Sequence, residues 1–138
     1  MRMHDLDYRD GTVICRGVVA YDDTASGKRP GALVFHEGLG LGEHIMERAR
    51  KVAKLGYVAL AADMFGDRRQ ARDLEDMRGL VGDLRNEPAK LRARARAALA
   101  TLASLPEVDA GRLCAIGFSS AVRLCLNWRA MAWISKLS

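Results

Sequence analysis

A serine stands directly after an apolar run, in the order Gly117-Phe118-Ser119-Ser120-Ala121. This order approximates Gly-x-Ser-x-Gly, the tight turn that joins a strand to a helix and holds a nucleophile above a sheet. Alanine at position 121 replaces the second glycine and is small enough for such a turn. In this turn the amide of Ser120 would donate to the oxyanion of an acyl-transfer reaction. The same residues also fit an ordinary strand-to-helix turn with serine caps.

A glutamate and a glycine-rich segment follow an earlier apolar run. Glu37 comes directly after Gly31 to His36, and glycines occupy positions 38, 40 and 42. A carboxylate beside a nucleophile can activate it, and the amide of Gly38 is a candidate second oxyanion donor. We therefore expect Ser119 and Glu37 to be catalytic residues, with Gly38 and Ser120 as the oxyanion hole. A competing role for Glu37 is to cap the following helix.

The same glycine-rich segment partly fits a dinucleotide-binding fingerprint. Its glycines are followed, about 20 residues later, by an acidic residue at the end of a strand, here Asp63. The fingerprint also needs glycine where a helix packs closely on the strand, and this position is Glu43. The fingerprint is incomplete, and a non-catalytic nucleotide-binding fragment remains an alternative.

Alternating apolar runs and amphipathic segments predict an α/β fold. Strands that alternate with helices pair in parallel, so functional residues are expected in the loops after His36, Ala62 and Phe118. The expected strands are Thr12 to Tyr21, Gly31 to His36, Tyr57 to Ala62 and Arg112 to Phe118, and the expected helices are Glu43 to Leu55, Ala71 to Arg85 and Pro88 to Leu105.

The composition is that of one ordinary globular domain, with 138 residues, 49% hydrophobic and 28% charged. The net charge of +5 does not indicate a nucleic-acid partner, because the basic residues are not interleaved with aromatic ones. Their densest run, from Lys90 to Arg96, lies in an expected helix. We interpret it as a solvated helix face.

The cysteines Cys15, Cys114 and Cys125 are too far apart for the paired spacing of a zinc or redox site. We expect no metal, no cofactor and a reducing, cytoplasmic location. The first residues are too polar for a secretory signal, and no apolar run is long enough to span a membrane. No membrane partner is therefore expected.

Two stretches resemble the dienelactone hydrolases. One runs from Arg29 to Gly66 and includes L-V-F-H-E-G-L-G-L-G and L-A-A-D-M-F-G, and the other is V-D-A-G-R-L-C-A-I-G-F from Val108 to Phe118. The resemblance implies a partial α/β-hydrolase fold, with three α/β/α layers and a mostly parallel sheet. It also implies hydrolysis of a lactone or carboxylic ester through an acyl-enzyme intermediate.

The resemblance also implies site residues. In the family a cysteine follows the Gly-Phe pair, where this chain has Ser119, and the glutamate that interacts with its thiol matches Glu37. The family's aspartate and histidine come later in the chain, but the histidines here are at positions 4, 36 and 44 only. Arg68 and Arg78 are the expected substrate-binding residues, in a segment where Arg69 and Arg72 are also candidates.

From Ser119 onward the residue-by-residue resemblance stops. Reading the tail in the neighbouring frame permits F-G-G-T-T-V-L-E-L-A-R-N-G-V-D-I-K-A, and the pair Asn127-Trp128 forces leucine in that frame. Loss of one base from a cysteine codon after Phe118 would produce this tail. We therefore expect residues 119–138 to be an aberrant tail on a truncated domain.

Three function classes follow. The first is a hydrolase of the dienelactone hydrolase family, of which this chain is an inactive truncated form. The second is a weak serine esterase that uses Ser119. The third is a non-catalytic binding or interaction fragment, and self-association through an exposed sheet edge is expected for a truncated sheet.

Overall fold

The computed structural model describes residues 1–24 and 26–117. Within them, five strands form one sheet in the order β1-β2-β4-β3-β5, and three helices pack around it. The elements are β1 (Arg2–Asp10), β2 (Val13–Tyr21), β3 (Arg29–Phe35), α1 (Glu43–Lys54), β4 (Val58–Ala62), α2 (Leu74–Asn86), α3 (Pro88–Ser104) and β5 (Val108–Gly117).

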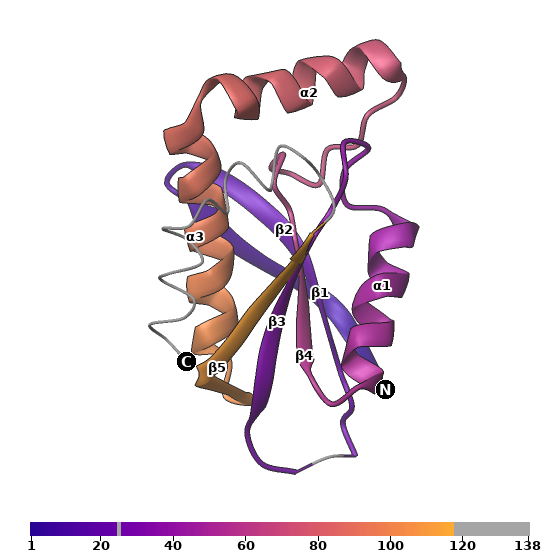
Figure 1. Ribbon diagram of the computed structural model, residues 1–138, viewed down its shortest axis with the longest axis vertical. Helices are drawn as coiled ribbons and strands as arrows, with labels where there is room; N and C mark the ends of the chain where they lie inside the picture. Colours follow the sequence, from indigo (N-terminus) through magenta and orange to yellow (C-terminus); the bar gives the residue numbers. More distant parts are fainter. Residues whose placement is uncertain (25, 118–138) are drawn as a thin grey trace.

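The sheet lies between α1 on one face and α3 on the other (Figure 1), which confirms the expected three-layer α/β/α architecture. Every residue of β4 is buried, and so are the last five of β3. Strands covered on both faces need apolar side chains in both directions, which explains their continuous apolar runs. Helix α2 crosses the end of the sheet at which the parallel strands finish.

The sheet is more evenly mixed than the sequence suggests. β3 pairs in parallel with β4 and β5, whereas β2 pairs antiparallel with both β1 and β4. The sequence analysis did not expect β1. Tyr8 is the one residue of this strand that is buried, so the strand has almost no apolar pattern by which to recognise it.

A buried carboxylate organises the loop after β4. Asp63 has no exposed surface, and it accepts hydrogen bonds from the backbone amides of Arg16 (2.9 Å), Gly66 (3.1 Å) and Arg68 (2.7 Å). Its own amide donates to the hydroxyl of Tyr8 at 3.0 Å. These contacts fasten the loop to β1 and β2, so Asp63 has a structural role.

The same loop has an unusual backbone. Asp67 and Arg68 both adopt left-handed conformations, with φ of 51° and 50°. This conformation costs a residue other than glycine roughly 1 kcal/mol or more. The contacts that hold it include the Asp67 amide, which donates to the carbonyl of Ile14 at 2.7 Å, and the Arg68 amide on Asp63.

The reading of Lys90 to Arg96 as a solvated face is wrong for Arg94. The side chain of Arg94 is 3% exposed, with Nε donating to Asp10 at 3.0 Å and Nη1 to the carbonyl of Met64 at 2.7 Å. A buried guanidinium needs such partners because desolvation is costly. Neither partner is close to Arg94 in sequence, so the basic run gave no sign of the burial.

We predict that Gly79→Ala stabilises the protein by roughly 0.5–1 kcal/mol, because alanine favours a helix interior over glycine. Gly79 lies within α2, and an added Cβ there would meet nothing within 4 Å. Urea unfolding measures the change. The control is Gly31→Ala in β3, whose Cβ would lie 2.9 Å from Leu113 Cδ2 and should destabilise the core. A loss of stability in Gly79→Ala would contradict the prediction.

Candidate functional site

The candidate site lies at the carboxyl ends of β3 and β5. These two strands are parallel neighbours, and Phe35 is in register with Gly117. Glu37 follows Phe35 by two residues, and Ser119 follows Gly117 by two residues. Adjacent strands are about 4.8 Å apart, so Phe35 and Gly117 end β3 and β5 side by side at one edge of the sheet. Ser119, Ser120 and the rest of the tail lie outside the described residues.

Glu37 is half-exposed at this edge, and its carboxylate pairs with Arg48 of α1. The distance from Arg48 Nη1 to Glu37 Oε1 is 3.5 Å. The competing role as a helix cap does not agree with the structure, because α1 begins at Glu43 with Gly42 as its N-cap and no side-chain cap. Sequence reasoning missed Arg48, since nothing in the pattern of α1 distinguishes this arginine from Arg50.

His36 is a structural residue. It is 2% exposed, its Nδ1 lies 2.7 Å from the carbonyl of Glu37, and the amide of Met64 donates to its Nε2 at 3.0 Å. An amide can only donate, so Nε2 is the acceptor and Nδ1 carries the proton. Burial lowers the pKa of His36 below its usual 6.5, which favours the neutral ring. Both ring nitrogens are engaged, so this histidine is not suited to act as the base.

Gly38 lies under α2. A Cβ at Gly38 would lie 2.9 Å from the Cγ of Met77 and 3.3 Å from Val81, so glycine is required for α2 to approach. Among the described residues no carbonyl accepts a hydrogen bond from the Gly38 amide. This amide therefore remains a candidate oxyanion donor at the strand end.

The other glycines of this loop are explained by packing. Gly40 has φ of +98°, and a Cβ there would lie 2.6 Å from the carbonyl oxygen of Arg69. Gln70 Nε2 donates to the carbonyl of Leu41 at 3.1 Å, beside the first turn of α1. Residues 69 and 70 therefore cover the segment on which a dinucleotide pyrophosphate would have to rest. This packing argues against the nucleotide-binding alternative.

The two arginines expected to bind substrate lie apart. Arg68 donates through Nη2 to the carbonyl of Gly17 at 2.9 Å and to Asp5 at 3.1 Å, so its guanidinium is held by β1 and β2. Arg78 is exposed on α2, next to Met77, which covers Gly38. Arg78 thus adjoins a residue that packs on the loop after β3, whereas Arg68 is held at β1 and β2. A role in substrate binding stays a prediction for both.

Neither described cysteine is suited to replace the family's nucleophile. Burial raises the pKa of the Cys15 thiol to about 11 and also raises the pKa of the Cys114 thiol. Only the thiolate attacks well, so both thiols are poor nucleophiles at neutral pH.

Within residues 1–24 and 26–117, no group of three or more potential metal ligands occurs, and no helix is long and apolar enough to cross a membrane.

Comparison with known proteins decides the family. A sequence model of the Dienelactone hydrolase family matches residues 15–128. The chain belongs to this family. The match runs on to residue 128, so the similarity extends further into the tail than the residue-by-residue comparison indicated.

Solved structures agree with this assignment. The structure named m3DLH is 48% identical with a TM-score of 0.82, and it covers 85% of this chain and 49% of its own. The dienelactone hydrolase-like promiscuous phosphotriesterase P91 from metagenomic libraries is 42% identical with a TM-score of 0.85, covering 91% of this chain and 52% of its own. The fold is therefore that of an α/β-hydrolase, of which the chain spans about half.

A curated relative matches a shorter part of the chain. It is a provisionally named hydrolase fragment, YghX, of Escherichia coli (strain K12), 48% identical over 48 residues, which are 35% of this chain and 41% of that protein. The chain thus spans less than half the length of this relative.

We predict that His36 makes the protein less stable below about pH 6.5. Because burial lowers the pKa of His36, the unfolded chain binds this proton at a higher pH than the folded chain does. The free energy of unfolding should therefore fall as the pH drops through 6.5, the unfolded value. His36→Gln keeps an acceptor near Met64 but cannot titrate, so its fall should be smaller. Urea unfolding at pH 7.5 and 5.5 measures both.

His4→Gln, in the exposed strand β1, is the matched control. Its free energy of unfolding should fall between pH 7.5 and 5.5 as much as that of the wild type. Equal falls in the wild type and His36→Gln would show that His36 is not the group responsible.

Proposed function

We propose that the protein to which this chain corresponds hydrolyses a lactone or carboxylic ester bond through an acyl-enzyme intermediate. The register between Phe35 and Gly117 carries the proposal, because the strand that leads to Glu37 and the strand that precedes Ser119 in the sequence end side by side. Membership of the dienelactone hydrolase family supports the same reaction class.

Each residue of the site has a distinct role in this proposal. The nucleophile at position 119 gives its proton to the Glu37 carboxylate and attacks the carbonyl carbon to form the acyl bond. The alkoxide leaves with the electrons of the broken C–O bond and takes up that proton. The amides of Gly38 and Ser120 stabilise the oxyanion of the tetrahedral intermediate. The carboxylate of Glu37 activates the nucleophile. Water then hydrolyses the acyl-enzyme.

Substrate binding and location form a finer part of the proposal. The substrate is a small ester or lactone, and Arg78 or Arg68 would bind it if it carries a carboxylate.

The location is cytoplasmic, because Cys15 and Cys114 are free thiols, which a reducing compartment maintains. In the described part of the chain, β5 pairs on one side only, which supports self-association through this edge.

The tail is interpreted as the product of a frameshift after Phe118, and this chain as an inactive form. A serine hydroxyl attacks only when a base removes its proton. Of the histidines, His36 is buried and engaged on both nitrogens, and His4 lies in β1. His44 lies at the start of α1, and none of the three histidines follows position 119 in the chain, which is where this fold places its catalytic histidine.

Sequencing the coding DNA from codon 112 onward tests the origin of the tail. We expect a neighbouring frame that encodes F-G-G-T after Phe118 and later supplies an aspartate and a histidine. If no such frame exists, the tail is authentic and the frameshift interpretation is wrong.

Enzyme assays test the reaction and the role of Glu37. We expect the protein expressed from the restored frame to hydrolyse a chromogenic ester such as p-nitrophenyl acetate. Glu37→Gln should lower its kcat/KM roughly a hundredfold or more, because the nucleophile loses its activating carboxylate. The matched control is Glu43→Gln, an exposed glutamate at the start of α1, which should retain the activity.

The present 138-residue chain should show no ester turnover above the buffer rate. If it does turn over an ester and Ser119→Ala abolishes the activity, the weak serine esterase is the correct function. A restored-frame protein that folds but hydrolyses neither esters nor lactones would overturn the hydrolase proposal.

A further inference from the structure

A small cleft lies where α2, the first turns of α3 and the loop after β4 meet. It is open to solvent, and the space between its walls, solvent included, is about 200 Å³. Phe65 of the loop and Leu80 of α2 form part of its apolar wall. The cleft contains none of the residues assigned above to the reaction, so it needs an explanation of its own.

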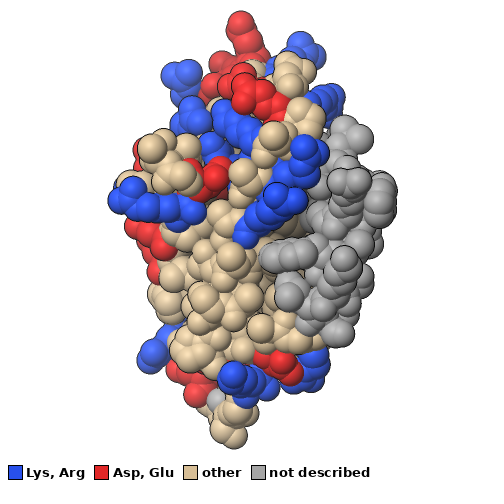
Figure 2. All heavy atoms as spheres, turned by 90° about the vertical axis from the view of Figure 1, so that its left-hand side faces the viewer, with Lys and Arg blue, Asp and Glu red and all other residues tan. Residues whose placement is uncertain are grey.

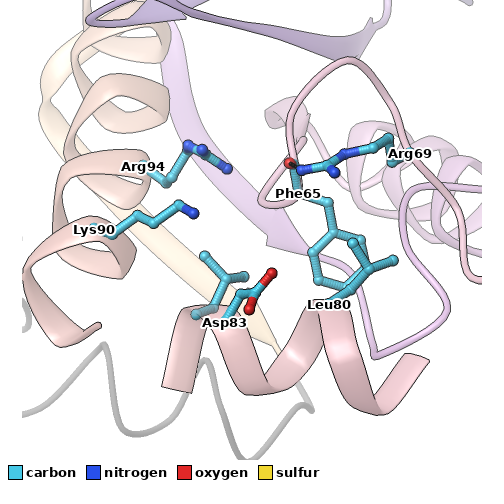
Figure 3. Close-up of a pocket in the computed structure, with 7 residues that line it drawn as sticks. Phe65, Arg69, Leu80, Asp83, Lys90 and Arg94 are labelled. Carbon is cyan, nitrogen blue, oxygen red and sulfur yellow. Dashed lines mark hydrogen bonds between the residues drawn. The ribbon is translucent and has the colours of Figure 1, made fainter. Parts of the chain in front are cut away.

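Positive charge dominates the lining of this cleft. Arg69 comes from the loop after β4, and Lys90 and Arg94 come from α3. In Figure 3 the cationic ends of Lys90 and Arg94 point across the cleft toward that of Arg69. Asp83 of α2 is the one carboxylate among the described lining residues. Figure 2 shows Lys and Arg side chains, interspersed with Asp and Glu, at this end of the molecule, above a largely uncharged surface.

Two of the three cations are held in place by the protein. Arg94 is buried, and its contacts with Asp10 and the Met64 carbonyl use two of the five N–H donors of a guanidinium. Its side chain also lines the cleft. On the opposite wall, Arg69 Nη2 donates to the carbonyl of Phe65 at 2.9 Å. These arginines cannot relax far apart, although their charges repel.

The third cation and the carboxylate do not neutralise each other at contact distance. Among the described residues, neither Lys90 nor Asp83 takes part in an ion pair within 4.0 Å. Asp10 lies close to Arg94 alone. The cleft thus retains an excess of positive charge with donors directed to its centre.

We propose that this cleft binds a small oxyanion, a phosphate or carboxylate group, between Arg69, Lys90 and Arg94. Arginine presents a planar fork of donors that matches such oxyanions, and lysine adds a compact charge. The anion would link the loop after β4 to α3. It would relieve the repulsion that the fixed arginines and Lys90 now share. This proposal does not depend on the hydrolase activity.

Titration calorimetry on the full chain at pH 7.5, with inorganic phosphate as the probe, tests the proposal directly. We expect saturable binding, together with a rise in Tm relative to sodium chloride of equal ionic strength. Lys90→Met should weaken binding roughly tenfold or more, because it removes a charge-assisted hydrogen bond. Arg92→Met, on the same helix but outside the cleft lining, is the matched control and should bind normally.

Asp83→Asn separates a built site from a general salt effect. Removing the carboxylate of the cleft should tighten phosphate binding, whereas a mere loss of structure would weaken it. A titration with acetate distinguishes a carboxylate site from one selective for phosphate. No saturable binding of either anion, or equal binding by the wild type and Lys90→Met, would overturn the proposal.

Discussion

The carboxylate of Asp63 is fully buried, and the shape of the loop after β4 depends on the hydrogen bonds that it accepts. A buried carboxylate without donors would be strongly destabilising. Here the backbone amides of Arg16, Gly66 and Arg68 satisfy it. The loop must therefore turn back on itself and lie against β2, which places its next residues over the glycine-rich segment.

The loop after β4 in turn contacts the glycine-rich loop after β3. The carbonyl of Arg69 lies so close to Gly40 that no side chain fits, and the amide of Met64 fixes the ring of His36. His36 in turn contacts the carbonyl of Glu37. The backbone of the candidate catalytic residue is thus tied to a polar network that begins on a neighbouring strand.

The sequence predicted the parts of the fold that have strong local patterns. The runs that became β3 and β4 are apolar on both faces, and α3 shows a clear apolar stripe closed by Pro106. The sequence did not predict β1, which is mostly exposed, or the burial of Arg94, whose partners are distant in sequence. Glu37 could be placed at a strand end, but its pairing with Arg48 could not, because it depends on how α1 packs.

The left-handed pair Asp67 and Arg68 shows how late in folding the candidate site must form. These residues need the carbonyl of Ile14 and the carboxylate of Asp63 to offset their unfavourable backbone conformation. The first of these partners lies in β2, and β1 covers that strand's outer edge. Contacts of such wide sequence separation form slowly, since the chain entropy of closing long loops is lost before they contribute. The N-terminal hairpin is therefore a scaffold that completes the site, although none of its residues faces the substrate in the proposed reaction.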